Sequence, residues 1–503
     1  MTLRGRLPAF PGFVVTLAHR VAARWLAGSL CLGVAVCNAQ PTPHPLAHRA
    51  SHPTPQPASK ATPPSTAAVP LQLASPTAAP TSPALPPLPA APVPVPALSS
   101  AAQRLYEQAR GDLVQVRTLL VGQGSQASVG SGFVVADGGD IVTNYHVVSQ
   151  AALEPGRFRL TYSHVDGRQG SLALLAVDVV HDLAVLRPGE AEPVARGLSF
   201  RSPQDALEQG EHLYSLGHPL DVGFAVVEGV YNGLVERSHV PSIFFSGALN
   251  AGMSGGPALD AQGRVIGVNV ATRLDGQQVS FLVPAQRARE LLAKARRATP
   301  VTSSMYPEIG RQLMAYQEDL TRRFLALPWR SSGHARYRVP VPQEAFMRCW
   351  GQGSAADSKG MRFERSECSM NQGVFVGGLL STGVMSTRHE IYDGRSLGPW
   401  RHARQVSASF ANEALPGGRH RTAARCSERY VRSDGLPMRA VVCLNAYRKL
   451  PGLYDVSVLA LTLDDPTGGV LGRFDARGVA FDNALKLAEA YIKGFGWTAA
   501  PSR

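Results

Sequence analysis

The chain has 503 residues, of which 44% are hydrophobic and 17% charged, and its formal net charge is +13. These values exclude wholesale disorder, a collagen-like chain and a multi-span membrane protein, because no apolar run reaches the roughly 18–20 residues of a spanning helix. The arginines are scattered, so the positive charge predicts weak attraction to anionic surfaces and no nucleic-acid binding.

Residues 1–39 have the pattern of an export signal. Four arginines precede an apolar stretch from Trp25 to Val36, and small residues follow up to Ala39. This order predicts a signal peptide cleaved after Ala39, and therefore a periplasmic or secreted protein without a stable membrane span. Two alternatives stay open. An uncleaved anchor would be short, and lipidation of Cys37 fits poorly with the preceding Val36.

Residues 40–99 form a tract rich in Pro, Ala, Ser and Thr. The tract holds 18 of the 39 prolines and no acidic residue. Such a composition cannot bury enough apolar surface to form a core, and proline favours extended geometry. The tract is therefore predicted to be a disordered, semi-rigid linker. The rest of the chain has room for two domains of ordinary size.

Residues 100–298 are rich in short apolar runs broken by Gly and Asp. Gly138-Gly139 and residues 261–263 lie where tight turns between strands are expected. Short strands at this spacing predict an antiparallel sandwich or barrel. Apolar residues at helical spacing predict a closing helix from Pro284 to Ala298.

Three of these runs carry a polar residue at an apolar strand edge, namely His146, Asp182 and Ser254. A serine hydroxyl is a poor nucleophile at neutral pH. It needs a base, and the base needs a carboxylate that orients it. Glycines around Ser254 let the backbone approach a reacting carbonyl closely. The N–H groups of Gly252 and Ser254 would then converge on the developing oxyanion.

This region resembles the trypsin-like (chymotrypsin-fold) serine proteases, and within them the periplasmic HtrA/Deg group. The resemblance implies an all-β fold of two six-stranded β-barrels with the active site in the cleft between them. The order His, Asp, Ser along the chain fits that fold. The matching segments are residues 130–133, 143–148, 181–186, 216–219, 252–257 and 265–269.

The resemblance implies an exported serine endopeptidase that cleaves protein or peptide substrates through an acyl-enzyme, with a role in envelope protein quality control. His146 would be the general base and then the acid, Asp182 its orienting carboxylate, and Ser254 the nucleophile. Gly252 and Ser254 would form the oxyanion hole. No cofactor and no metal are implied. Relatives are often trimers, so a homo-oligomer is expected by analogy.

The sequence departs from the family at two places. Met253 stands where digestive enzymes have an Asp that pairs with a freed N-terminus, so the means of holding the oxyanion loop is not evident. Residues 247–250, expected at the base of the specificity pocket, contain no carboxylate. Selectivity for Arg or Lys is therefore not expected, and a small or medium apolar residue is predicted. His181 and His218 are interpreted as structural.

Two alternative functions stay open. Residues 252–256 also fit G-x-S-x-G, the nucleophile elbow of α/β-hydrolases, and His389, His402 and His420 lie downstream. That fold needs a helix after the serine, whereas Pro257 begins a strand–turn–strand pattern. The second alternative is a catalytically silent protease fold that serves as a binding or scaffold protein.

The resemblance ends near a linker at residues 298–304. Relatives of the HtrA type continue into PDZ domains, but no GLGF-like carboxylate-binding loop is found here. Helical spacing predicts an amphipathic helix from Pro307 to Leu327. A β-rich stretch follows over residues 336–480, and a last helix over 483–493. These elements predict an α+β domain of unknown role over residues 305–498.

The remaining four cysteines all fall in this second domain. Asp434-Gly435 is a strong two-residue hairpin turn signal, and Cys426 and Cys443 are equidistant from it. The pair falls on a non-hydrogen-bonded site, where Cα atoms lie about 4.5 Å apart, within disulfide reach. A Cys426–Cys443 disulfide is predicted, which leaves Cys349 with Cys368. A zinc site is the alternative, but CxxC spacing is absent.

Overall fold

The fold is described from a computed structural model of the chain. The predicted export signal lies outside the described residues, and so does the predicted linker apart from Ser99, which caps the first helix. The Ser99 Oγ accepts a hydrogen bond from the amide of Ala102 at 3.1 Å. The structure describes residues 99–498 except 190–195, 220–222, 273–277, 332–333, 356, 412–414 and 416.

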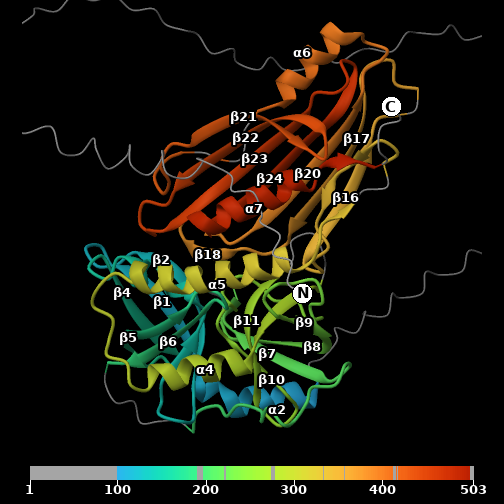
Figure 1. The fold of residues 1–503 in the computed structure, drawn as a ribbon. Coiled ribbons are helices and arrows are strands. Elements are labelled where there is room, and N and C mark those ends of the chain that lie inside the picture. The colour runs from blue at the N-terminus through green and yellow to red at the C-terminus, as the bar shows by residue number, and fades with distance from the viewer. Residues whose placement is uncertain are drawn as a thin grey trace, which may run out of the picture. The chain divides into compact units, whose positions relative to one another are not determined.

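The first six strands form a closed antiparallel barrel in the order β1-β2-β3-β6-β5-β4. Strands β1, β2, β3 and β6 are buried along continuous runs of residues, whereas β4 alternates between buried and partly exposed positions. Figure 1 shows this barrel in cyan and green. Its strands are β1 (Leu113–Leu120), β2 (Gln126–Val134), β3 (Ile141–Thr143), β4 (Phe158–His164), β5 (Gln169–Asp178) and β6 (Leu183–Pro188).

The next six strands close a second barrel in the order β10-β11-β12-β9-β8-β7. The predicted double-barrel architecture is therefore confirmed. The predicted closing helix is shorter than expected, because α4 spans Ala285–Ala295. The N-terminal helix α2 spans Ser100–Ala109. The strands are β7 (His212–Gly217), β8 (Ala225–Leu234), β9 (Ile243–Phe245), β10 (Pro257–Leu259), β11 (Val265–Thr272) and β12 (Ser280–Pro284).

The apolar pattern predicts His146 at a strand edge, but the structure places it in the first turn of a helix. Strand β3 ends at Thr143, and helix α3 spans Tyr145–Leu153. Asn144 has extended backbone geometry and precedes the helix. The amide of Tyr145 donates to the carbonyl of Asp182 at 3.1 Å, which satisfies one free N–H of the first helical turn. This hydrogen bond to the residue that precedes the neighbouring strand β6 fixes the first residue of the helix.

The C-terminal region centres on a seven-stranded antiparallel sheet in the order β16-β17-β20-β24-β23-β22-β21. Helices α5 (Tyr306–Ala326) and α7 (Phe481–Lys493) pack on β23 and β24, and α6 spans Pro399–Ser409. The predicted α+β architecture with a β-rich centre is confirmed. The sheet strands are β16 (Met347–Gly353), β17 (Arg362–Met370), β20 (Met385–Asp393), β21 (Arg425–Ser433), β22 (Leu436–Ala446), β23 (Leu453–Thr462) and β24 (Gly468–Ala480).

Six short strands pair outside this sheet. Strands β18 and β19 form a small hairpin, β13 pairs with β15, and β14 pairs with β25. Of these strands, β18 contacts helix α3 of the first barrel. The bounds are β13 (Arg330–Ser331), β14 (Tyr337–Arg338), β15 (Pro340–Val341), β18 (Val374–Gly377), β19 (Leu380–Thr382) and β25 (Gly496–Trp497).

The hairpin of β21 and β22 has the register that the sequence predicts. Asp434 and Gly435 form the turn, and Cys426 lies opposite Cys443. Their Cα atoms are 4.0 Å apart and the two residues form a disulfide. A second disulfide joins Cys349 on β16 to Cys368 on β17. Both disulfides therefore cross-link neighbouring strands on the two outer sides of the sheet.

The C-terminal region packs directly against the first barrel. The amide of Val301 donates to the carbonyl of Leu174 at 2.8 Å, and that of Met305 to Ala152 at 2.9 Å. Residues on α3 and residues on α5, among them Ile309, belong to one continuous hydrophobic cluster. The predicted linker at 298–304 is thus bound to the barrel surface by backbone hydrogen bonds.

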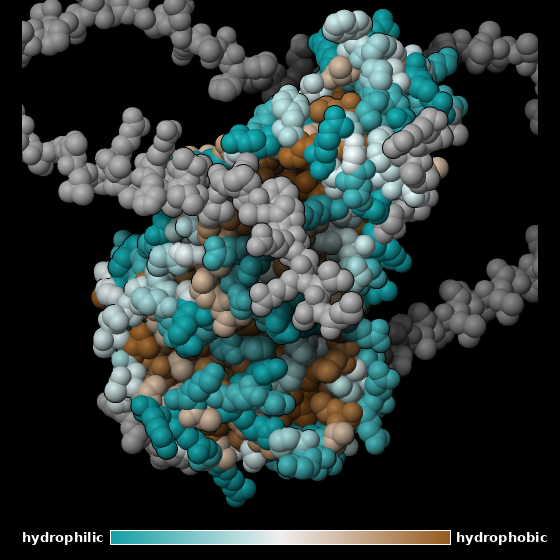
Figure 2. All heavy atoms as spheres, viewed as in Figure 1, coloured by the Kyte–Doolittle hydropathy of each residue, from teal (hydrophilic) through white to brown (hydrophobic). Residues whose placement is uncertain are grey.

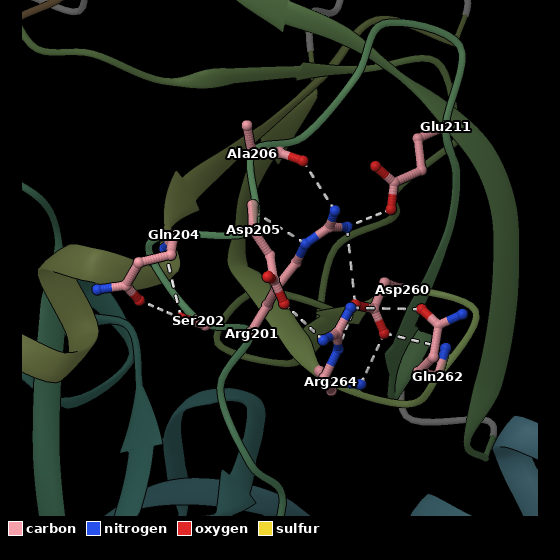
Figure 3. A network of polar contacts seen from close by, with 9 residues as sticks. All are labelled: Arg201, Ser202, Gln204, Asp205, Ala206, Glu211, Asp260, Gln262 and Arg264. Atoms are coloured by element: carbon pink, nitrogen blue, oxygen red, sulfur yellow. Dashed lines mark hydrogen bonds and ion pairs between the residues drawn. The ribbon is translucent and has the colours of Figure 1, made fainter.

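A polar network fixes the segment between the barrels onto the second barrel (Figure 3). The fully buried carboxylate of Asp260 accepts from the backbone amides of Gln262 and Arg264 and from the Arg264 Nε at 2.8 Å. Arg201 lies 3.7 Å from the same carboxylate and also pairs with Glu211. Asp260 therefore links the β10–β11 turn to the segment that carries Arg201.

Replacing Asp260 by alanine is expected to lower the free energy of unfolding by about 3–5 kcal/mol, because the Arg264 and Arg201 guanidinium groups lose a buried partner. Denaturant titration would measure this loss. The matched control is Asp137→Ala, since Asp137 and Arg296 form an exposed pair whose removal is expected to cost about 1 kcal/mol or less. Equal effects of the two substitutions would contradict the prediction.

On the face drawn in Figure 2, hydrophobic surface is broken into separate patches between hydrophilic side chains. Within the described residues, none of the helices has both the length and the apolar character needed to cross a bilayer.

Candidate active site

The imidazole of His146 is bound to the carboxylate of Asp182. The distance from His146 Nδ1 to Asp182 Oδ2 is 2.6 Å, and the amide of His146 donates to Oδ1 at 2.8 Å. The two side chains are 33% and 21% exposed. Because both carboxylate oxygens bind the same residue, the ring is held with Nδ1 toward Asp182 and Nε2 free to face a substrate.

Asp182 has a left-handed backbone conformation with φ of 55°. This region is uncommon for residues other than glycine, although Asp and Asn tolerate it best. Two donors fix the Asp182 carbonyl in this conformation, namely the Nδ2 of Asn144 at 2.8 Å and the amide of Tyr145 at 3.1 Å. The side chain is therefore aimed at His146 by contacts of its own backbone.

The pKa of His146 is raised above its ordinary value. Burial of the ring by itself lowers the pKa, but the negative charge of Asp182 and its hydrogen bond to the ring raise it, and these two effects prevail. Asp182 thus stabilises the protonated imidazolium. A base with this partner can accept a proton from a nearby hydroxyl and keep it while a reaction proceeds.

Ser254 lies in the loop between β9 and β10, against the first barrel. Its carbonyl accepts from the amide of Ser131 at 2.8 Å, and its Oγ donates to the carbonyl of Val270 at 3.0 Å. A Cβ atom at Gly130 would come within 3.0 Å of both Val147 and Ser254. Gly130 therefore packs between Ser254 and Val147, which lies next to His146 on helix α3.

No hydrogen bond joins the Ser254 hydroxyl to His146 within the described residues. Rotation about the Cα–Cβ bond of Ser254 would release the hydroxyl from Val270 and redirect it. Hydrogen bonds between catalytic groups are often long or absent without substrate and form only when it binds. In the structure the Ser254 hydroxyl is thus bound to a backbone carbonyl.

The loop that precedes Ser254 has an unusual backbone conformation at Gly252. Gly252 has a positive φ of 91°, which a residue with a side chain rarely adopts. Its carbonyl accepts from the Oγ of Ser131 at 2.7 Å. Within the described residues, the N–H groups of Gly252 and Ser254 have no hydrogen-bond partner. Both groups are therefore available to a ligand oxygen.

The structure explains how this loop is held without the Asp of digestive enzymes. The side chain of Met253 is fully buried in the hydrophobic core of the second barrel, beside residues such as Leu249. The buried amide of Asn269 donates from Nδ2 to the carbonyls of Met253 and Leu216, at 3.2 and 2.9 Å. Ser215 donates to the Oδ1 of the same amide at 2.7 Å. An apolar anchor and one amide thus fix the loop.

Three positioning residues were not singled out by the sequence reasoning, namely Ser131, Tyr145 and Asn269. All three lie within segments that carry the family resemblance, and Asn269 is the last residue of the segment 265–269. Asn269 interrupts the apolar run of β11, and a polar amide in such a strand is a signal in itself, because a buried amide needs partners.

His181 forms a second His–Asp pair, because its Nδ1 lies 2.7 Å from the Asp178 Oδ2. This pair has no contact with Ser254 in the described residues. The alternative of a nucleophile elbow does not fit, because strand β10 follows Ser254 where that fold needs a helix. His389 and His402 are buried within the C-terminal region, where His389 stacks on Tyr491.

In comparison with known proteins, the family model of the trypsin-like peptidase domain matches residues 130–268. The chain is 33% identical over 178 residues to the mitochondrial serine protease HTRA2 of Bos taurus, covering 34% of this chain and 37% of that protein. It is 30% identical over 178 residues to a protein of Marinomonas named "Probable periplasmic serine endoprotease DegP-like", covering 34% and 36%.

The chain spans between about a third and a half of the length of these curated relatives. Among solved structures, the serine endoprotease from Yersinia pestis is similar at 22% identity and a TM-score of 0.34, covering 40% of this chain and 68% of that one.

Proposed function

We propose that the protein is an exported serine endopeptidase that hydrolyses protein substrates through Ser254, His146 and Asp182. The observation that carries the proposal is the His146–Asp182 pair, with Nδ1 bound to Oδ2 at 2.6 Å, at the junction where Ser254 meets the first barrel. The similarity of residues 130–268 to trypsin-like peptidase domains supports it independently. The name of the Marinomonas relative, a periplasmic serine endoprotease, supports export. A role in envelope protein quality control is part of the same proposal.

The chemistry is that of acyl transfer. As the Ser254 Oγ forms a bond to the substrate carbonyl carbon, its proton passes to the Nε2 of His146, and Asp182 stabilises the imidazolium. The oxyanion accepts from the amides of Gly252 and Ser254. The C–N bond breaks as His146 returns the proton to the leaving amine. Water then attacks the acyl-enzyme by the same route and releases the acid, so no cofactor is consumed.

Labelling with a fluorophosphonate probe tests the proposal. The expected result is one covalent adduct, located on Ser254 by peptide mass mapping and absent from Ser254→Ala. Heat-denatured protein is the control, because the reaction needs the assembled base. A folded protein that takes no label between pH 6 and 9 would contradict the proposal and favour a protease fold that serves only for binding.

The pH dependence of peptide hydrolysis gives a second test. Below the pKa of His146, the imidazole carries a proton and cannot accept one from Ser254, so kcat/KM should rise with pH through that pKa. Asp182 raises this pKa, and the midpoint of the rise is therefore expected above about 6.5. Initial rates across a buffer series would measure it. A midpoint clearly below this value would contradict the assignment of His146 as the base.

A further inference from the structure

A cavity of about 270 Å³ lies between the barrels and the C-terminal region. Its wall on the barrel side includes Asp182, the partner of His146, and Val270, whose carbonyl receives the Ser254 hydroxyl. The cavity therefore extends to the residues of the candidate active site. A polypeptide bound across Ser254 would have its neighbouring side chains beside this cavity.

The walls of the cavity are mainly apolar and come from both parts of the chain. Val180, Val240 and Phe281 line it from the barrels, and Phe346 and Phe375 line it from the C-terminal region. Apolar walls with few polar groups are typical of pockets that bind apolar ligand groups. Neither the barrels nor the C-terminal region would enclose this space without the other.

The volume of the cavity suits one large side chain. An apolar cavity of about 150 Å³ is enough to hold a benzene molecule, so 270 Å³ has room for a phenylalanine or leucine side chain. Full burial of such a side chain contributes about 1.5–3 kcal/mol. This energy corresponds to roughly 10- to 150-fold in affinity.

One buried polar atom in the wall has no partner. The side chain of His239 is 5% exposed and lies between the rings of Tyr316 and Phe346, whose centroids are 5.1 and 5.2 Å from its own. Its Nδ1 makes no hydrogen bond within the described residues, and its Nε2 is 3.6 Å from the Oδ2 of Asp319. The wall around His239 therefore consists mainly of aromatic rings.

The C-terminal wall is fixed to the barrels by hydrogen bonds on two sides. The hydroxyl of Tyr145, next to His146, donates to the carbonyl of Val376 on β18 at 2.6 Å. The Oγ of Ser238 donates to the Oε1 of Gln372 at 2.7 Å. The wall is thus tied both to the helix of the catalytic base and to the loop that carries His239. This arrangement gives the pocket a fixed shape before substrate binds.

We propose that this cavity is a specificity pocket, which takes a large apolar side chain of the polypeptide substrate near the scissile bond and which the C-terminal region helps to form. The proposal rests on the serine endopeptidase function proposed above. It gives the C-terminal region a role in substrate selection, in addition to supporting the helix that carries His146.

Peptide binding to the full chain with Ser254→Ala tests the pocket without requiring hydrolysis. A series of dye-labelled octapeptides, each with Phe at one position of an Ala/Gly host, would be titrated by fluorescence anisotropy. We expect Phe at one position to tighten binding by about tenfold or more over Ala. Val240→Trp and Gln372→Trp fill the pocket from its two walls, and each is expected to abolish most of this preference.

Matched controls carry the same substitutions at exposed sites, namely Val121→Trp in the first barrel and Gln352→Trp on β16. Both should keep the Phe preference. Thermal unfolding would show whether each variant is folded. Because the two substitutions fill the pocket from opposite walls, either folded variant is enough to test the proposal. A Phe preference that survives the filling substitutions, or no preference at any position, would overturn the proposal.

The outcome is separable from that of the proposed function. If the wild-type protein cleaves peptides but the filling variants do not change the preference, the pocket is disproved and the hydrolytic function stands. If the wild-type protein takes no fluorophosphonate label while the filling variants abolish the Phe preference, the pocket stands as a peptide-binding site. In that case the hydrolytic function is disproved.

Discussion

Replacement of Ser254 by alanine is expected to lower the kcat of peptide hydrolysis by about 10⁶-fold, to the level of contaminating or background cleavage. The reason is that the acyl-enzyme cannot form without the hydroxyl, and the remaining groups only bind and polarise the substrate. Steady-state hydrolysis of a fluorogenic peptide would measure the loss. Binding of the same peptide should be retained, because the amides of Gly252 and residue 254 remain.

A control variant should remove a hydroxyl of similar size outside the site. Ser409 on α6 of the C-terminal region is partly exposed, and its Oγ bonds the carbonyl of Gln405 in the preceding turn and the Tyr392 side chain, away from the candidate active site. Ser409→Ala is therefore expected to leave kcat unchanged. A Ser254→Ala protein with more than a small fraction of wild-type activity, after separation from contaminating proteases, would show that another residue is the nucleophile.

Replacement of Asp182 by asparagine is expected to lower kcat by about 10⁴-fold. Asparagine fits the left-handed backbone at this position, since its short polar side chain tolerates that conformation. The fold should therefore survive while the charge is lost. Without the charge, the pKa of His146 falls, and the amide group favours the wrong ring tautomer. Rates over a pH series should show both the loss and a midpoint moved to lower pH.

The neighbouring His–Asp pair provides the control. Asp178 binds His181 with the same contact, Oδ2 to Nδ1 at 2.7 Å, and is also hydrogen-bonded to the amide of that histidine. Asp178→Asn should therefore make a comparable change to charge and hydrogen bonding but leave kcat nearly unchanged. Equal losses in Asp178→Asn and Asp182→Asn would indicate a general effect on the first barrel and contradict a specific role of Asp182.

The loop around Met253 shows why the sequence motif alone does not predict how the backbone before Ser254 is held. The sequence around Met253 lacks the carboxylate that holds this loop in digestive enzymes, and none of the residues next to Met253 in the chain replaces it. The structure shows that Met253 packs in the core of the second barrel and that Asn269, sixteen residues later, binds its carbonyl. The conformation of the loop before Ser254 depends on contacts between residues that are distant in sequence. The residues around Met253 alone therefore do not reveal it.

In the C-terminal region, too, some features follow from local sequence rules and others only from tertiary packing. The hairpin register, and with it the Cys426–Cys443 disulfide, follows from Asp434-Gly435 because a two-residue turn fixes every pair that follows. No comparable local rule predicts that β18 contacts the helix of His146. That contact depends on how the apolar side chains of α3 and α5 pack into one buried hydrophobic cluster.

The amino-acid sequence by itself determined the strand pattern of the barrels, the order of the three candidate catalytic residues and the pairing of the hairpin cysteines. These features depend on short-range rules of turns, side-chain alternation and motif spacing. Only the tertiary structure decided that His146 lies in the first turn of a helix, that Asp182 has a left-handed backbone and that a cavity lies between the barrels and the C-terminal region. Each of these depends on the packing of segments far apart in the chain, where burial and long-range hydrogen bonds override local preference.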